Sequence, residues 1–371
     1  MPKTNTIQTK PHYPILDGLR GVAAVIVVAF HIFEAHAASS YTQIINHGYL
    51  AVDFFFVLSG FVIGYAYDDR WGKLTIGGFF KRRLVRLQPM VVLGSIIGAA
   101  CFYFGDSTMW PMIHTIPVWK MLVMMLIGFT LIPIPVSWDI RGWQEMHPLN
   151  GPAWSLFFEY LANIFYALGV RKLSKTALTI LVIIAAGVLI QYSVTCSSGD
   201  LAGGWSLNGE QLRIGFTRLI YPFFAGLLLS RVVKPGQIKN AFLLSSVLIV
   251  IVFFMPRIGD AHTNWMNGLY ESLSIILVFP LIVYIGASGT MEGVKENKIC
   301  KFLGDISYPI YITHYAFIYI YTAWASDNHN ASFELKWIYG VITFLVSISV
   351  GYLSLKYYDE PVRAWLKRKW Q

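Results

Sequence analysis

Apolar stretches of about twenty residues recur along the whole chain and are separated by short polar segments. A helix of about 20 apolar residues is long enough to cross the hydrocarbon core of a bilayer. The pattern therefore predicts an all-α polytopic membrane protein. Its eleven candidate helical segments lie at residues 15–36, 48–67, 87–105, 117–135, 151–170, 176–195, 214–231, 240–256, 266–287, 302–322 and 336–356.

The composition agrees with this pattern and excludes an ordinary water-soluble domain. Of the 371 residues, 56% are hydrophobic and 13% are charged, whereas a soluble domain carries roughly a quarter of charged residues. The mean hydropathy is +0.54. The sequence has no Gly/Ser-rich linker, long polar tail or obvious repeat. We therefore expect residues 1–371 to form one integral-membrane domain with no appended soluble domain.

The N-terminal region could also be interpreted as a secretory signal peptide. Lys3 and Lys10 precede the first apolar run, and Ala35-His36-Ala37 is similar to a signal-peptidase cleavage site. However, the run follows Asp17, contains His31 and is succeeded by nine or more further apolar segments. These features favour a retained first transmembrane helix.

The basic residues predict the topology. Lys and Arg number 29 against 20 acidic residues, giving a net charge of +9. They cluster in short segments beside the apolar runs, which is typical of cytoplasmic loops rather than of a nucleic-acid-binding surface. If every cluster is cytoplasmic, the number of crossings between two clusters must be even. The clusters lie at residues 3–20, 70–86, 171–175, 231–239, 295–301 and 356–369.

One interval breaks this rule, because three apolar segments lie between Arg86 and Arg171. We expect segment 117–135 to be a re-entrant or interfacial helix, since Lys120 lies near its start and prolines flank it. Segment 87–105 is the alternative. Either choice leaves about ten crossings, with both termini in the cytoplasm.

Ionisable residues inside apolar segments are costly and are candidates for functional sites. Arg20 and His31 lie eleven residues apart in the first segment. On a helix this spacing places both on one face, about 16 Å apart along the axis. The alternative is an arginine that reaches the lipid headgroups and a histidine hydrogen-bonded in the protein interior.

A second candidate is the arginine cluster Arg82, Arg83 and Arg86. Positions three and four apart share a helix face, so these side chains can converge. Guanidinium groups are forked, permanently charged donors that suit phosphate oxygens. Taken alone, the cluster is better interpreted as a topology determinant that contacts anionic lipid.

The remaining polar candidates are spread over other segments. Glu159 lies within the fifth segment and needs a partner there. Asp53 is interpreted either as a cap of the second segment or as an acceptor-side residue, and Ser59-Gly60 as a close-packing patch. Ser307, Tyr311 and His314 share a helical face by their spacing. Asp359-Glu360-Pro361 is expected to end the last segment.

No metal site is expected. The three cysteines, Cys101, Cys196 and Cys300, are far apart and odd in number, and they form no cluster with histidines. This pattern predicts neither a disulfide framework nor a structural zinc site.

Together these motifs resemble the acyltransferase-three family of membrane proteins, and the resemblance covers nearly the whole chain. Any one motif is weakly specific, but six occur in order at family-like spacing. They are Leu16-Asp17-Gly18-Leu19-Arg20-Gly21 followed by His31, Phe55-Phe56-Val57-Leu58-Ser59-Gly60-Phe61, Phe80 to Pro89, Trp154-Ser155-Leu156 followed by Glu159, Leu303-Gly304 followed by Ser307-Tyr308 and His314, and Glu360-Pro361.

The resemblance implies ten crossings, a bacterial inner (cytoplasmic) membrane, and transfer of an acyl group from a coenzyme A thioester to a hydroxyl. It implies a catalytic role for His31, and a role in holding the acyl-CoA donor for Arg20, Arg82, Arg83 and Arg86. Acetyl is the expected cargo, and a carbohydrate or glycolipid of the cell envelope is the expected acceptor. The sequence departs from some relatives, because Tyr160 follows Glu159 and no hydrolase-like domain follows the last segment.

The expected mechanism uses His31 as the base, because imidazole titrates near physiological pH. Glu159 is expected to orient His31 or to bind acceptor hydroxyls. Substrate-binding candidates are Asp53, Trp154, Tyr311 and His314. The sequence leaves open whether the acyl group passes directly or through an acyl-histidine. The alternative function is a transporter or flippase that uses the buried charges as a solute or proton path.

Overall fold

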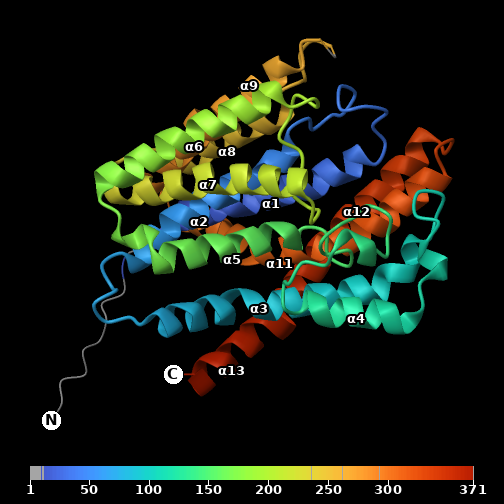
Figure 1. Cartoon of the computed structure of the whole chain (residues 1–371), viewed down its shortest axis with the longest axis horizontal. Helices are drawn as coiled ribbons and strands as arrows, with labels where there is room; N and C mark the ends of the chain where they lie inside the picture. Colours follow the sequence, from blue (N-terminus) through green and yellow to red (C-terminus); the bar gives the residue numbers. More distant parts are fainter. Residues whose placement is uncertain (1–9, 11, 235, 261, 292, 371) are drawn as a thin grey trace.

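The computed structural model describes residues 10, 12–234, 236–260, 262–291 and 293–370 (Figure 1). Lys3, which belongs to the first basic cluster, lies outside these residues. The described chain is helical and contains no strand beyond two isolated bridges. Its α-helices are α1 (Pro14–Glu34), α2 (Ala51–Tyr67), α3 (Ile76–Cys101), α4 (Val118–Gly128), α5 (Ala153–Leu168), α6 (Lys175–Thr195), α7 (Gly209–Val232), α8 (Ala241–Phe254), α9 (Trp265–Leu273), α10 (Phe279–Ala287), α11 (Val294–Asp327), α12 (Phe333–Ser354) and α13 (Glu360–Trp370).

Short π-helical turns join two pairs of these helices. The turn Ser274–Val278 links α9 to α10, and Leu355–Asp359 links α12 to α13. Each pair therefore continues as one helical rod, so the predicted segment 266–287 is confirmed as continuous. π-Turns occur frequently at functional sites, and the second of these turns ends beside a cavity described below.

The helices are those of a multi-pass membrane protein. Within the described residues, seven helical segments are long and apolar enough to cross a bilayer. They include α1, α3, α6, α7 and the α9–α10 rod. The all-α class is thus confirmed, while the number of ten crossings and the cytoplasmic position of the termini stay predictions.

The segment singled out as non-crossing is helical over only part of its length. Helix α4 has 11 residues and lies between Pro117 and Phe129, so it is about 16 Å long against a hydrocarbon core of about 30 Å. Helix α3 has 26 residues by contrast. The structure therefore favours 117–135 over 87–105 as the segment that does not cross.

The arginine cluster lies on helix α3, which begins before the predicted apolar segment 87–105. Helix α3 begins at Ile76, where the side chain of Thr75 accepts a hydrogen bond from the backbone N–H of Gly78. Such a cap satisfies one of the free donors at a helix start. The helix assumed for the three arginines is therefore present, whereas residue 87 was too late a start for the segment because the charges hide an early helix start from a hydropathy criterion.

Close helix contacts surround α1 and α2. The most extensive contacts join α1 to α11 and α2 to α7. A Cβ atom on Gly60 would lie 1.9 Å from the carbonyl oxygen of Phe223, and one on Gly226 would lie 2.0 Å from that of Val57. Only glycine permits this approach, so the interpretation of Gly60 as a close-packing position is confirmed.

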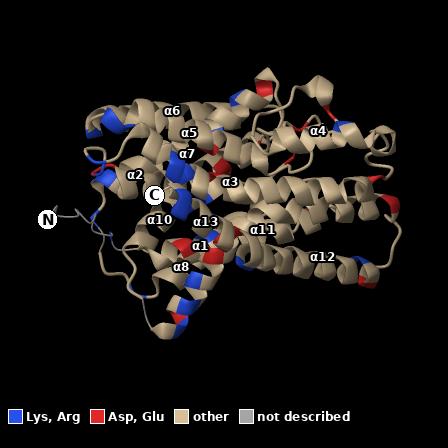
Figure 2. Cartoon of the chain, turned by 90° about the horizontal axis from the view of Figure 1, so that it is seen from below, with Lys and Arg blue, Asp and Glu red and all other residues tan. Residues whose placement is uncertain are grey.

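Charge is distributed unevenly along the bundle. Helices α1, α2, α6 and α7 run side by side in Figure 1, and α13 leaves the bundle obliquely. Figure 2 shows Lys and Arg gathered at the start of α6 and on α13. Lys10 also lies at this end, where its ammonium group contacts the Asp69 carboxylate just after α2. The end of the bundle where α1 begins is therefore the basic end.

Candidate active site

Three cavities follow one another along α1. The arginine cavity, of about 400 Å³, lies at the start of α1 and is lined by His12, Asp17, Arg20, Arg86, Lys301, Asp305, Asp359 and Arg363 among others. The central cavity, of about 90 Å³, is lined by Ser59, Arg83, Glu159 and Tyr311 among others. The histidine cavity, of about 620 Å³, is lined by His31, Glu34, Trp143, Glu145, Trp154, Trp205 and Arg218 among others.

Shared side chains connect the three spaces. Arg20 and Arg86 line both the arginine and the central cavity. Val52 and Tyr311 line both the central and the histidine cavity. Arg20 and His31 therefore lie toward opposite ends of a row of three adjoining cavities, on the same side of α1. The polar face predicted for the first segment, from Arg20 to His31, is thus the side of α1 that borders the cavities.

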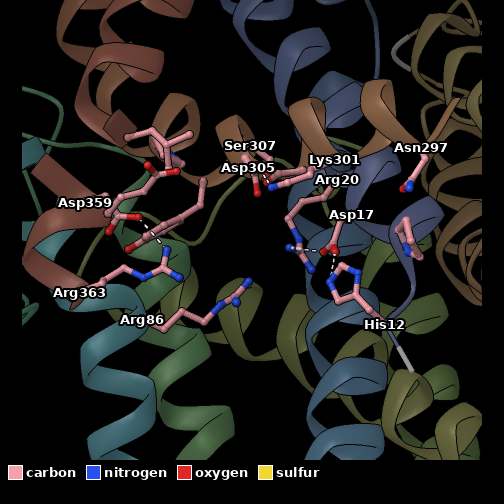
Figure 3. Close-up of a pocket in the computed structure, with 16 residues that line it drawn as sticks. His12, Asp17, Arg20, Arg86, Asn297, Lys301, Asp305, Ser307, Asp359 and Arg363 are labelled. Atoms are coloured by element: carbon pink, nitrogen blue, oxygen red, sulfur yellow. Dashed lines mark hydrogen bonds and ion pairs between the residues drawn. The ribbon is translucent and has the colours of Figure 1, made fainter. Parts of the chain in front are cut away.

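The arginine cavity combines side chains of both signs. Asp17 accepts a hydrogen bond from Arg20 at 3.1 Å and lies 2.7 Å from His12 Nε2. The hydrogen bond to Asp17 raises the pKa of His12. Asp359 accepts from Arg363 at 2.8 Å. Figure 3 shows these two groups on opposite sides of the cavity, with the Arg86 side chain between them.

The predicted arginine cluster divides into three different environments. Arg83 is buried and its guanidinium lies 2.5 Å from the Glu159 carboxylate. Arg86 lines the arginine and central cavities. Arg82 is exposed and is not among the residues that line the three cavities. The side chains therefore do not converge as a group of three.

Glu159 belongs to the central cavity. Its Oε1 accepts hydrogen bonds from Ser59 Oγ at 2.9 Å and from Arg83. The partner that a buried carboxylate requires is thus an arginine. His31, which the sequence suggested as a group for Glu159 to orient, has a different carboxylate partner.

That partner is Glu34, one turn further along α1. His31 Nδ1 lies 2.8 Å from Glu34 Oε2. Because a carboxylate accepts, this contact favours the tautomer with hydrogen on Nδ1 and leaves the Nε2 lone pair free to accept a proton. Sequence analysis missed Glu34, although the His-x-x-Glu spacing places the two side chains on one helix face.

The buried His314 side chain packs against the His31 ring. Its ring stacks on that of His31 with 5.7 Å between centroids, and its Nδ1 lies 3.0 Å from the Ile310 carbonyl oxygen and 2.9 Å from that of Tyr311. The side chain is fully buried and is not among those that line the histidine cavity. Tyr311 does line it, and its hydroxyl is 2.7 Å from Ser155 Oγ.

Asp53 is part of a buried ion pair. Arg218 donates to both of its oxygens, at 2.6 Å for the shorter contact, and both side chains have at most 1% exposure. The interpretation of Asp53 as a helix cap was wrong, because α2 begins at Ala51 with no side-chain cap. Arg218 also donates to the backbone carbonyl groups of Tyr49 and Gly203 and lies over the Trp154 ring.

A wider buried network continues from this pair. Glu271 accepts from the Tyr49 hydroxyl and from the backbone N–H of Leu201, and its Oε1 lies 3.1 Å from His47 Nδ1. Arg257 contacts Tyr49 and Asp200. Sequence analysis missed both Arg218 and Glu271. Each is an ionisable residue within a predicted segment, so the criterion that found Glu159 would have found them too.

No cluster of metal ligands occurs in the part of the chain that the structure describes. Cys101, Cys196 and Cys300 are free cysteines. The polar groups around the cavities are therefore arranged as ion pairs and hydrogen bonds. Such a set can bind a charged molecule at one end and move a proton at the other.

Comparison with known proteins agrees with this arrangement. The family model of the acyltransferase-three family, described as an acyltransferase domain, matches residues 13–356. A protein of Staphylococcus aureus (strain COL), provisionally named an O-acetyltransferase, is 26% identical over 95% of this chain and 57% of its own length. The peptidoglycan O-acetyltransferase OatA of Listeria monocytogenes is 22% identical over 97% of this chain and 57% of its own length.

A shorter relative, "Protein 2 in picA locus" of Rhizobium radiobacter, is 35% identical over 47% of this chain and 92% of its own length. No solved structure matches the chain. The chain spans 57% of the length of the O-acetyltransferases that it matches. Because the family match covers almost the entire series of helices and cavities, the chain belongs to the acyltransferase-three family.

Proposed function

We propose that the protein is a membrane-embedded O-acyltransferase of the bacterial inner membrane. It takes an acyl group, with acetyl as the proposed cargo, from cytoplasmic acyl-CoA. The acceptor is a hydroxyl of a carbohydrate or glycolipid of the cell envelope. The observation that carries this proposal is the row of three adjoining cavities from Arg20 to His31.

The arginine cavity is the proposed donor site. Coenzyme A carries several phosphates, and the guanidinium groups of Arg20, Arg86 and Arg363 face the cavity from three elements. Arginine forks bind phosphate oxygens through paired hydrogen bonds. Arg82 contributes only long-range attraction, since its side chain is exposed. Arg83, paired with Glu159, sits where the thioester arm would pass.

The central cavity limits this passage. Its volume of about 90 Å³ corresponds to about three water molecules. The thioester arm therefore reaches the histidine cavity only when lining side chains such as Phe55 or Tyr308 rotate aside.

The reaction itself takes place at His31. Nε2 removes the proton of the acceptor hydroxyl as its oxygen attacks the thioester carbonyl carbon. The carbon–sulfur bond then breaks, the coenzyme A thiolate leaves, and the proton on His31 passes to that sulfur. Glu34 stabilises the imidazolium that forms in between, because its carboxylate accepts from Nδ1.

The test is His31→Ala in purified protein, with acyl-CoA-dependent acylation of envelope saccharides measured by mass spectrometry. Loss of a general base is expected to lower kcat about 10²- to 10⁴-fold. His114→Ala is the matched control, since His114 is exposed and pairs with Asp106 outside the three cavities. Near-normal turnover in a folded His31→Ala protein would contradict the assignment. Flux of an unmodified solute in vesicles, without acyl transfer, would favour a transporter.

A further inference from the structure

The histidine cavity has an unusual wall of indole rings. Trp143 comes from the segment between α4 and α5, Trp205 from the segment between α6 and α7, and Trp154 from the start of α5. Trp143 and Trp205 keep 38% and 37% of their surface exposed, although both line a cavity. Large, partly exposed aromatic faces that line one cavity are typical of a ligand-binding surface.

The two segments that carry these rings are held together. Glu145 and Ser206 form an antiparallel bridge, and the backbone N–H of Met146 donates to the Trp205 carbonyl oxygen at 2.7 Å. Trp143 packs edge-on against the buried Trp110, with 4.8 Å between ring centroids. The Trp143 indole and the backbone that carries Trp205 are therefore positioned before any ligand binds, which reduces the entropic cost of binding.

A glycine makes the close approach of these elements possible. Gly204 has φ of +106°, and a Cβ atom there would lie 2.7 Å from the Trp154 ring. An L-residue with a side chain rarely adopts this conformation. The backbone of the segment that carries Trp205 thus lies directly on Trp154, which completes the aromatic wall.

Two carboxylates, those of Glu145 and Glu34, face the histidine cavity. Glu145 Oε2 accepts from the Tyr319 hydroxyl at 2.6 Å, while Oε1 has no partner among the described residues. Glu34 also lines the cavity, with its Oε2 at His31. Among the described residues that form the wall, the arginine is Arg218, and it is paired with Asp53. The cavity therefore offers hydrogen-bond acceptors, and its described lining residues include no unpaired arginine or lysine to hold an anion.

We propose that the histidine cavity binds an uncharged pyranose ring against the faces of Trp143 and Trp205, with Glu145 accepting a hydrogen bond from a ring hydroxyl. The C–H groups of a sugar carry partial positive charge and contact the electron-rich indole faces. The hydroxyl groups require acceptors, and Glu145 supplies one. A volume of about 620 Å³ is within the usual range for small-molecule sites. This inference rests on the proposed function and narrows its acceptor from carbohydrates in general to neutral sugars.

The experiment measures saccharide binding without any donor. The full chain is placed in lipid nanodiscs free of maltoside detergent, since the detergent headgroup would compete. Saturation-transfer NMR is then recorded with methyl glycosides of glucose, galactose, mannose and N-acetylglucosamine, and with methyl glucuronide as the charged counterpart. At least one neutral glycoside is expected to bind, and glucuronide at least about tenfold more weakly.

Variants locate the site. Trp143→Ala and Trp205→Ala are each expected to weaken binding of the neutral glycoside about tenfold. Trp138→Ala is the matched control, because Trp138 is 48% exposed in the same segment as Trp143 but outside the histidine cavity. Absence of binding by every neutral glycoside, equal binding of glucuronide, or unchanged binding in both variants would overturn the proposal.

Acyl-CoA hydrolysis by the protein in the same nanodiscs, measured without sugar, distinguishes failure of the sugar site from failure of the proposed acyltransferase function. Hydrolysis that depends on His31, together with no neutral sugar bound, would refute the sugar site and leave the acyltransferase function standing. Sugar binding at Trp143 with no acyl-CoA turnover in the presence of bound sugar would refute the acyltransferase function. The two failures are therefore distinguishable.

Discussion

The arginine cavity and the histidine cavity lie on the same helix and differ in almost every physical property. The first, of about 400 Å³, is bordered by guanidinium groups and by the carboxylates of Asp17 and Asp359. The second, of about 620 Å³, is bordered by indole and phenol rings, and its arginine is paired with Asp53. The first cavity presents charged side chains of both signs, including Asp305 and Glu360, whereas the second is mainly aromatic.

One helix can therefore border two cavities of different chemistry. Arg20 and His31 are eleven positions apart on α1, which keeps them on one side but about three turns apart. The central cavity between them is small and contains the Arg83 and Glu159 pair. Under the proposed function, each substrate binds in an environment suited to its charge, and only the acyl group moves between them.

The largest expected effect concerns the ion pair in the wall of the histidine cavity. Arg218→Ala leaves the Asp53 carboxylate buried without a partner, which is expected to destabilise the protein by about 3–5 kcal/mol. Thermal unfolding in nanodiscs measures the loss. Asp53→Leu combined with Arg218→Met should restore most of it. If Arg218→Ala unfolds at the wild-type temperature, the pair does not stabilise the cavity.

A second prediction concerns the pH dependence of the free energy of unfolding. We expect Glu145, which lines the histidine cavity, to contribute to it. Burial raises the pKa of Glu145 from 4.5 to about 7. The folded state therefore binds this proton more tightly than the unfolded state, so the stabilisation is present at low pH and is lost as pH rises to about 7. By pH 8 the loss is on the order of 3 kcal/mol.

Glu145→Gln cannot titrate but keeps an oxygen that can accept from Tyr319. Its unfolding temperature should therefore rise relative to the wild type as the pH increases from 5 to 8. A difference between the two proteins that does not change with pH would contradict the shifted pKa. The unfolding temperature of Asp17→Asn is compared with that of the wild type over the same pH range. This variant is the reference, because Asp17 lies in the arginine cavity and its carboxylate has cationic partners.

The third prediction tests whether donor binding belongs to the arginine cavity alone. Arg86→Ala should raise the KM for acyl-CoA about tenfold to a hundredfold, since it removes a charged donor that faces phosphates. The KM for the saccharide acceptor should stay unchanged. Lys81→Ala is the control, because Lys81 lies on the same helix but lines none of the three cavities. Equal effects on both KM values would remove the functional distinction between the cavities.

The smallest expected effect is that of Glu34→Gln. The Glu34 side chain is 50% exposed, so its ion pair with His31 is screened by water. We expect kcat to fall about two- to fivefold with both KM values unchanged. Glu210→Gln, at an exposed position of α7, serves as the comparison. A change confined to KM would assign Glu34 to substrate binding instead of to positioning His31.

Much of the fold and part of the site could be predicted from the sequence. The segments 15–36, 48–67 and 176–195 agree with helices to within a few residues, because apolar length is a local property. The common face of Arg20 and His31 follows from helix periodicity alone. The start of α3 could not be predicted in this way, since Lys81 and its neighbouring arginines lower the local hydropathy.

Partners of the candidate residues were harder to predict. Sequence spacing placed Arg82, Arg83 and Arg86 together, but rotation of α3 turns Arg83 toward α5 and leaves Arg82 exposed. Glu34 was missed although it is three residues from His31. Arg218 pairs with a carboxylate 165 positions away, and no local pattern connects them.

The sequence by itself determined that this protein is a multi-helix membrane protein of the acyltransferase-three family, and which ionisable groups lie within its helices. These properties depend on hydropathy and on the spacing of residues along one helix. The tertiary structure alone decided which charges neutralise each other and that Trp143 and Trp205 meet in one cavity. The physical reason is that pairing depends on how each helix is rotated and packed against distant ones, and only the folded bundle fixes those rotations.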